Sequence, residues 1–159
     1  MISLNDLAAA FGRNVAIIKA QTEGLTNEES LIAQPGGNCL NWVLGHIAVS
    51  RDEILEVLGE PPILGEESAR YKRNSKPVIG AEDGILPLDA LLARLDQSQE
   101  RIAIALARMD ESAMATEIRQ GDRTTTVGKR AFFLYFHETF HVGQTELFRQ
   151  LAGKNDKII

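Results

Sequence analysis

The sequence lacks several features that would define its class. It has a single cysteine, Cys39, so no disulfide can form within the chain. Its net charge is −5, so it has no positive field to bind nucleic-acid phosphates or an anionic membrane. No apolar run approaches the ~20 residues of a membrane-spanning helix, and the N-terminus lacks the basic and apolar regions of a secretory signal. These absences argue against nucleic-acid and membrane partners and predict a soluble, cytoplasmic protein.

The composition is that of a globular protein. Hydrophobic residues make up 44% of the chain and charged residues 25%, which is ordinary for a folded domain. A chain of 159 residues can bury a hydrophobic core, and we find no internal repeat or low-complexity tract. We therefore predict one domain over residues 1–159.

Apolar residues recur at spacings of three and four over four long segments, which indicates amphipathic helices. The predicted helices cover residues 4–24, 39–59, 87–109 and 127–153. Candidate N-terminal caps precede three of them: Ser3 with Asp6, Asn38, and Thr126. Without a convincing strand pattern, these helices predict an all-α fold, a four-helix bundle.

Two segments between the helices lack helical periodicity. Residues 59–86 are rich in glycine, proline and charge, and a loop of that length is more often functional or a crossover than idle. We therefore predict a long crossover connection between helices 2 and 3, with at most short turns. Residues 117–127, EIRQGDRTTTV, are compatible with either a small hairpin or an irregular loop.

The chain has only three histidines, His46, His137 and His141. Four residues along a helix are a rotation of ~400°, so His137 and His141 lie about 40° apart on one face and can share a metal ion. We expect both rings to point into the bundle, because the spacing places them on one stripe with apolar residues such as Leu134 and Phe148. An imidazole buried there without a partner costs about 1–3 kcal/mol.

His46 lies in the middle of the predicted second helix. If helices 2 and 4 are neighbours, the three imidazoles converge, and three neutral imidazoles with an open position suit zinc, nickel or iron. The alternative is that each histidine is a core residue, hydrogen-bonded to a carbonyl or carboxylate group. Spacing alone leaves both interpretations open.

The segment HETFH also matches the H-E-x-x-H motif of zinc peptidases, in which the glutamate is the general base. A peptidase needs a third ligand, commonly downstream, and the short segment after His141 offers only the carboxylates of Glu146 and Asp156. We therefore reject a peptidase. Glu138 lies ~100° around the helix from His137. It is either a proton acceptor beside a metal or a solvated or interhelical carboxylate.

Longer motifs resemble a known family. The pattern W-x-x-x-H in NCLNWVLGHIA is followed by H-x-x-x-H-x-G-Q and L-x-R-x-L in FHETFHVGQTELFRQLAG. The chain thereby resembles the DinB-like superfamily of four-helix bundles, which includes bacillithiol and mycothiol S-transferases and a thiol-dependent maleylpyruvate isomerase. The resemblance implies a divalent metal ion, commonly zinc or nickel, held by His46, His137 and His141. It also commonly implies a homodimer.

Two classes of function follow from this resemblance. The first is a metal-dependent enzyme on small molecules, either a thiol S-transferase, in which the metal favours the thiolate of a low-molecular-weight thiol, or a hydrolase that uses metal-bound water. Glu138 is the candidate proton acceptor. The second is a non-enzymatic, metal-stabilised dimeric interaction protein.

Further residues are weaker candidates. A basic group could meet an anionic cosubstrate or be solvated surface charge: Arg70, Lys72, Arg73 and Arg149. Tyr71 and Tyr135 are pocket hydrogen-bonders or core residues. Four phenylalanines cover more than one face of the fourth helix, which predicts a central position in the bundle or a dimer contact: Phe132, Phe133, Phe136 and Phe140.

Overall fold

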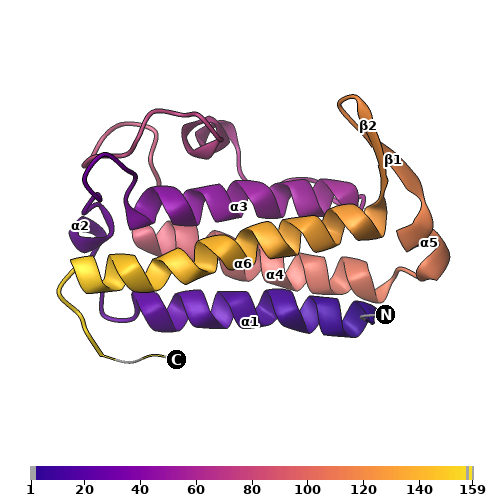
Figure 1. Cartoon of the computed structure of the whole chain (residues 1–159), viewed down its shortest axis with the longest axis horizontal. Coiled ribbons are helices and arrows are strands. Elements are labelled where there is room, and N and C mark those ends of the chain that lie inside the picture. Colours follow the sequence, from indigo (N-terminus) through magenta and orange to yellow (C-terminus); the bar gives the residue numbers. More distant parts are fainter. Residues whose placement is uncertain (1–2, 157, 159) are drawn as a thin grey trace.

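The computed structural model describes residues 3–156 and 158 of the chain. Within them, four long helices pack into a bundle (Figure 1), which confirms the predicted all-α fold. The long helices are α1 (Leu4–Thr22), α3 (Leu40–Val57), α4 (Leu88–Ala107) and α6 (Val127–Leu151). Short elements join them: α2 (Asn27–Ser30), the 3₁₀ helix η1 (Glu66–Tyr71), α5 (Glu111–Ala115), and the strands β1 (Glu117–Gln120) and β2 (Arg123–Thr126).

The helix starts follow the predicted caps in two of three cases. Ser3 and Asp6 form a reciprocal capping box at α1, and the Thr126 hydroxyl accepts from the N–H of Lys129 at α6. The prediction of Asn38 as the cap of α3 is wrong. Cys39 occupies that position without a side-chain hydrogen bond, and the backbone holds the start of the helix instead, since Ala33 and Cys39 form an antiparallel bridge.

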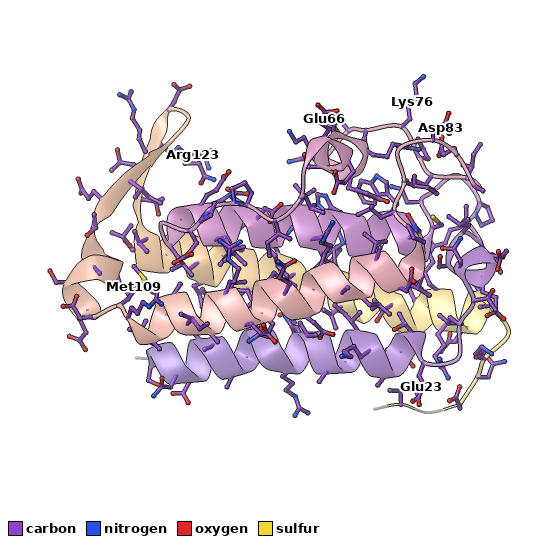
Figure 2. The ribbon with its side chains drawn as sticks, turned by 180° about the vertical axis from the view of Figure 1, so that it is seen from behind. Glu23, Glu66, Lys76, Asp83, Met109 and Arg123 are labelled. Carbon is purple, nitrogen blue, oxygen red and sulfur yellow. The ribbon has the colours of Figure 1, made fainter. Side chains whose placement is uncertain are left out.

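The long connection between α3 and α4 is a crossover, as predicted. α3 and α4 begin at the same end of the bundle, where the Asn41 side chain donates to the carbonyl oxygen of Leu86 (2.8 Å). The chain must therefore return along the whole bundle after α3 ends. Figure 2 shows this return from behind, with Glu66, Lys76 and Asp83 on the connecting segment, and η1 lies above the middle of α3 in Figure 1.

Each long helix has two neighbours among the other three. α1 and α3 both pack against α4 and α6, so α1 and α3 lie on one diagonal of the bundle. The segment after α5 is a hairpin, the first of the two predicted alternatives. β1 and β2 pair antiparallel, and the hairpin extends away from the end of the bundle, with Arg123 near its tip (Figure 2).

Two large apolar clusters lie along the bundle. One contains Ile18, Leu44 and Leu91, and the other contains Phe11, Ile54 and Leu134. A small third cluster contains Leu31, Cys39 and Val78. No helix in the described part of the chain has the length and apolar character needed to cross a membrane.

Candidate metal centre

The three histidines of the chain converge between α3 and α6. One ring nitrogen each from His46, His137 and His141 lies within 4.8 Å of the other two. The second and fourth long helices, α3 and α6, are neighbours, which meets the condition for convergence and brings His46 to the other pair. His46 is buried, whereas His137 and His141 are partly exposed, so the group lies at the edge of the core and is reached from one side.

A backbone carbonyl orients His46. Its Nδ1 donates to the carbonyl oxygen of Tyr71 (2.8 Å), which can only accept a hydrogen bond. In the neutral ring the proton is thus on Nδ1, and Nε2 keeps its lone pair. Tyr71 itself is fully buried. Its hydroxyl donates to Asn41 Oδ1 (3.2 Å) and accepts from the N–H of Leu86 (2.6 Å), so the crossover segment holds this carbonyl in place.

Side chains contact the outer nitrogens of the other two rings. His141 Nδ1 donates to Gln144 Oε1 (2.7 Å), and Ser50 Oγ lies 3.3 Å from His137 Nδ1. Such outer partners fix the tautomer and the ring orientation in metal sites. In all three histidines, therefore, Nδ1 is the nitrogen bound to the protein and Nε2 is the one free to act as a ligand.

The spacing of the inner nitrogens fits a metal ion. His141 Nε2 and His137 Nε2 are 3.3 Å apart. Two imidazole nitrogens that each lie ~2.0–2.1 Å from one tetrahedral ion are separated by roughly 3.3 Å. With His46 as the third ligand, the residues present fit a three-histidine site for a divalent cation with an open position.

The surroundings keep the rings of His137 and His141 neutral, as metal ligation requires. Burial, followed by the neighbouring His141 and His46, lowers the pKa of His137 from 6.5 to about 4. Burial also lowers the pKa of His141, although its hydrogen bond with Gln144 acts in the opposite direction. These two rings therefore present lone pairs at neutral pH.

Aromatic side chains surround the three rings. Trp42 stacks on His46, with ring centroids 4.8 Å apart and planes 10° apart. Phe133 stacks on His137 at 6.4 Å, and Phe140 meets His141 edge-on at 5.3 Å. Trp42 is itself held by the crossover segment, since its indole N–H donates to Ser75 Oγ (2.9 Å). The site thus has apolar walls.

The prediction that the rings of His137 and His141 point into the bundle needs a correction. Sequence spacing placed His137 and His141 on the inward face of the helix, but both rings are only partly buried. The side chain that points directly inward is Glu138, which has no exposed surface. The reason is that α6 is apolar around most of its circumference, so its apolar residues alone did not identify the inward face.

Glu138 forms a buried ion pair with Arg51 of α3. Arg51 Nη2 donates to Glu138 Oε1 (2.8 Å) and Arg51 Nε donates to Oε2 (2.9 Å), and neither side chain is exposed. The expectation of a solvated carboxylate is therefore wrong, and the alternative of an interhelical one is confirmed. The group of converging metal ligands does not include Glu138. Its role as proton acceptor stays a prediction.

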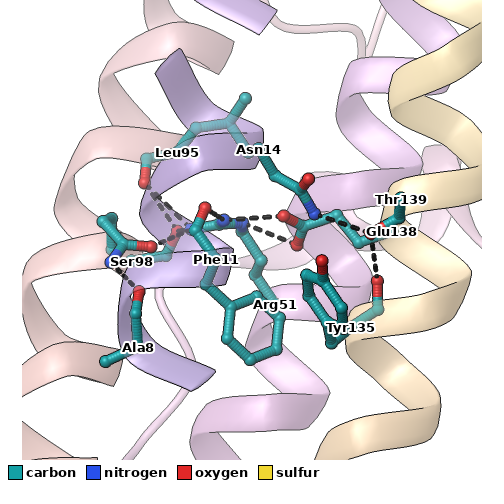
Figure 3. A network of polar contacts seen from close by, with 10 residues as sticks. Ala8, Phe11, Asn14, Arg51, Leu95, Ser98, Tyr135, Glu138 and Thr139 are labelled. Carbon is teal, nitrogen blue, oxygen red and sulfur yellow. Dashed lines mark hydrogen bonds and ion pairs between the residues drawn. The ribbon is translucent and has the colours of Figure 1, made fainter. Parts of the chain in front are cut away.

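The same guanidinium connects all four long helices (Figure 3). Arg51 also donates to the carbonyl oxygen of Phe11 in α1 (3.1 Å) and to Ser98 Oγ in α4 (3.2 Å). Next along α6, Thr139 accepts from Asn14 Nδ2 of α1 (3.1 Å). This network lies between the two apolar clusters, and it sets how α6, and with it His137, sits against α3.

Three of the other charged and aromatic candidates, Arg149, Arg70 and Tyr135, have structural contacts. Arg149 donates to Asp156 and to the carbonyl oxygens of Gln21 and Glu23, so it ties the C-terminal segment to α1 and is not solvated surface charge. Arg70 is bonded within the crossover segment, to Glu82 among others. Lys72 and Arg73 are exposed. Tyr135 packs edge-on against Phe11 at 5.4 Å.

Sequence reasoning gave no role to four residues that shape the site: Ser50, Arg51, Gln144 and the carbonyl of Tyr71. Gln144 is part of the H-x-x-x-H-x-G-Q motif, so the sequence did contain a signal for its contact with His141. Arg51 falls on the apolar stripe of its helix with Leu44, Ile47 and Leu55, and a charge there predicts a buried partner. The Tyr71 contact joins residues 25 positions apart and has no local signature.

Comparison with known proteins agrees with this architecture. Two solved structures superimpose on the chain: a conserved protein from Enterococcus faecalis (TM-score 0.77, 16% identity, 97% of this chain and 99% of that one) and a DinB-like protein from Bacillus cereus ATCC 10987 (TM-score 0.72, 18% identity, 97% and 95%). At these identities the likeness shows the fold alone. No curated protein sequence matches the chain. A model of the DinB superfamily matches residues 11–145, and the chain therefore belongs to the DinB superfamily.

Proposed function

We propose that this protein binds one divalent metal ion, zinc or nickel, through His46, His137 and His141. The proposal rests on the different contacts of the two nitrogens in each ring. Each Nδ1 contacts a protein group, and the Nε2 atoms of His137 and His141 lie at the separation that one ion requires. Two neutral imidazoles that both present lone pairs at this distance repel each other unless a cation or a proton lies between them.

Metal content tests this proposal. Protein purified without a histidine tag, incubated with zinc or nickel and desalted, is expected to retain about one ion per chain, because three imidazoles bind such ions tightly. The variant His137→Ala is expected to retain a small fraction of that amount. Glu146→Ala, at an exposed position of the same helix, serves as the control and should match the wild type. Clearly less than one ion per wild-type chain would refute the site.

Gln144 offers a second prediction, because it contacts a histidine but cannot replace one. Gln144→Leu removes the acceptor of the His141 Nδ1–H bond, so the ring loses its fixed orientation. We expect the metal affinity to fall by about 10- to 100-fold, the usual cost of losing an outer partner. Competition with a chromogenic chelator measures the affinity, and Gln97→Leu, at an exposed position of α4, is the control. Equal affinities would show that Gln144 does not orient His141.

We further propose that the metal serves an enzyme acting on small molecules, of the thiol S-transferase type. A divalent cation held by three imidazoles supplies Lewis acidity at its open position. The apolar walls made by Trp42, Phe133 and Phe140 exclude water beside that position, and the partial exposure of His137 and His141 leaves it accessible. In the cytoplasm, where we expect the chain, low-molecular-weight thiols are abundant cosubstrates.

A screen separates this activity from its alternatives. Metal-loaded protein is incubated with a panel of low-molecular-weight thiols and an electrophilic reporter, and metal-loaded Glu146→Ala and metal-free His137→Ala are run beside it. Metal-dependent loss of thiol supports a transferase. Hydrolysis of ester or amide reporters without a thiol supports the metal-dependent hydrolase instead. Full metal binding without either reaction favours a non-enzymatic, metal-stabilised protein.

A further inference from the structure

The crossover segment forms a tight turn immediately after η1. The N–H of Ser75 donates to the carbonyl oxygen of Lys72 (3.0 Å), and Asn74 has a positive φ of 69°. Asparagine tolerates this left-handed conformation better than most residues do, so the sequence suits a turn at this point. Lys72, Arg73 and Asn74 are all exposed. The turn therefore presents the side chain of Arg73 to solvent from one of its two central positions.

Two hydrogen bonds hold this turn against the metal centre. Just before it, the carbonyl oxygen of Tyr71 accepts from His46 Nδ1 (2.8 Å). At its end, Ser75 Oγ accepts from the indole N–H of Trp42 (2.9 Å). Trp42 and His46 are one helical turn apart on α3, and the crossover segment lies above this helix in Figure 1. Arg73 thus lies between a contact to a histidine ligand and a contact to the apolar wall beside it.

The turn adds a free positive charge to the site. After burial and the other two histidines, the causes that lower the pKa of His137 are the charges of Arg130 and Arg73. Arg130 is already neutralised by its ion pair with Glu53, and its guanidinium lies 5.0 Å from the ring centroid of Phe133. Arg73, by contrast, has no ion-pair partner within the described part of the chain.

This charge does not serve the metal ion. A guanidinium near a divalent cation weakens metal binding, because like charges repel. An anionic group beside the open position of the metal balances the two positive charges. A guanidinium binds a carboxylate through two parallel hydrogen bonds. Since Arg130 is paired with Glu53, a single guanidinium is free, and it matches the single charge of a carboxylate better than the double charge of a phosphate.

We propose that Arg73 binds a carboxylate group of the small molecule that the metal centre takes, and that it thereby selects anionic substrates over neutral ones. The inference rests on the proposed function, because the other end of the same molecule must reach the open position of the metal. The apolar walls made by Trp42 and Phe140 contact the part between the two ends. Arg73 is then a specificity-determining residue that takes no part in holding the metal.

Two thiols that differ in one carboxylate test the proposal: N-acetylcysteine and N-acetylcysteamine. Each is titrated into cobalt-loaded protein, because the absorption of cobalt(II) changes when a thiolate becomes its ligand. We expect Arg73→Ala to bind N-acetylcysteine about 10-fold more weakly than the wild type does, which is the contribution of one hydrogen bond to a charged group. Both proteins should bind N-acetylcysteamine equally, since it lacks the carboxylate.

Two further variants separate a specific contact from a general effect of charge. Lys76→Ala removes the same charge from the same segment, but Lys76 points away from the bundle in Figure 2, so this variant should bind both thiols as the wild type does. Arg73→Lys keeps the charge without the paired hydrogen bonds and should recover part of the affinity. Three results would overturn the proposal: Arg73→Ala binds N-acetylcysteine as tightly as the wild type, it weakens both thiols equally, or Lys76→Ala weakens N-acetylcysteine as much.

Failure of the proposed function gives a different result. If neither thiol changes the cobalt spectrum, no thiol reaches the metal and the S-transferase type of activity is refuted. N-acetylalanine, which has the carboxylate but no thiol, then tests Arg73 separately. Its binding to metal-loaded protein is followed by the fluorescence of Trp42, the only tryptophan of the chain. The wild type should bind it more tightly than Arg73→Ala does, and equal affinities would refute the role of Arg73.

Discussion

Glu138→Gln is expected to lower the free energy of unfolding by about 3–5 kcal/mol, the usual cost of removing one partner of a buried ion pair. The amide occupies nearly the same volume, but it leaves the Arg51 guanidinium charged in the core, where neither side chain has any exposed surface. Chemical denaturation of the metal-free protein measures this loss. An unchanged unfolding free energy would show that the pair does not stabilise the bundle.

This instability complicates any test of Glu138 in catalysis, because lost activity can follow from lost structure. The double variant Arg51→Met/Glu138→Leu provides the matched control. Replacement of a whole buried ion pair by apolar residues of similar volume is often neutral or stabilising, so we expect the double variant to recover most of the stability. If a reaction is found, activity retained in this variant removes Glu138 from the mechanism. Activity lost despite a stable fold and full metal content supports its role as proton acceptor.

Much of the fold follows from local patterns. The spacing of apolar residues located the four long helices, and the capping box of Ser3 and Asp6 located the start of α1, because both signals depend on residues three or four positions apart. The pair His137 and His141 was recognisable for the same reason. Their convergence with His46 required only that the second and fourth long helices be neighbours.

The orientation of α6 could not be predicted in the same way. Several of its phenylalanines and leucines, among them Phe136, Phe140 and Leu147, are exposed, whereas a glutamate lies on the core side beside Leu134 and Val142. A pattern of apolar residues identifies the buried face only when the other face is polar. Here the apolar residues on the exposed face misled the interpretation, and the buried carboxylate could be explained only by Arg51 on another helix.

The contacts of the histidine Nδ1 atoms could not be predicted from the sequence either. The Tyr71 carbonyl that orients His46 belongs to the aperiodic crossover segment, and a backbone acceptor has no signature in a sequence. What places it is the packing of a tyrosine ring on a glycine. A Cβ built on Gly45 of α3 would lie only 2.0 Å from Cδ1 of the Tyr71 ring, so only a residue without a side chain allows this contact.

Gly45→Ala is therefore expected to act on both the fold and the metal site. The added methyl group forces the Tyr71 ring out of its buried position, which costs about 1–3 kcal/mol of stability as for other overpacked cores. The Tyr71 carbonyl then leaves His46 Nδ1, and the metal affinity is expected to fall by about 10- to 100-fold. Denaturation and chelator competition measure the two effects. Gly143→Ala adds the same methyl group where no atom lies within 4 Å, and it should not lower the stability of the metal-free protein.

A double-mutant cycle shows whether Tyr71 is the cause. In a Tyr71→Ala background the space above Gly45 is empty, so Gly45→Ala should no longer destabilise the protein, and it should gain stability because alanine favours a helix over glycine by about 1 kcal/mol. An equal loss in both backgrounds would contradict the close approach of the ring to the helix. A loss of stability without a loss of metal affinity would instead show that His46 does not need the Tyr71 carbonyl to hold its ring in position.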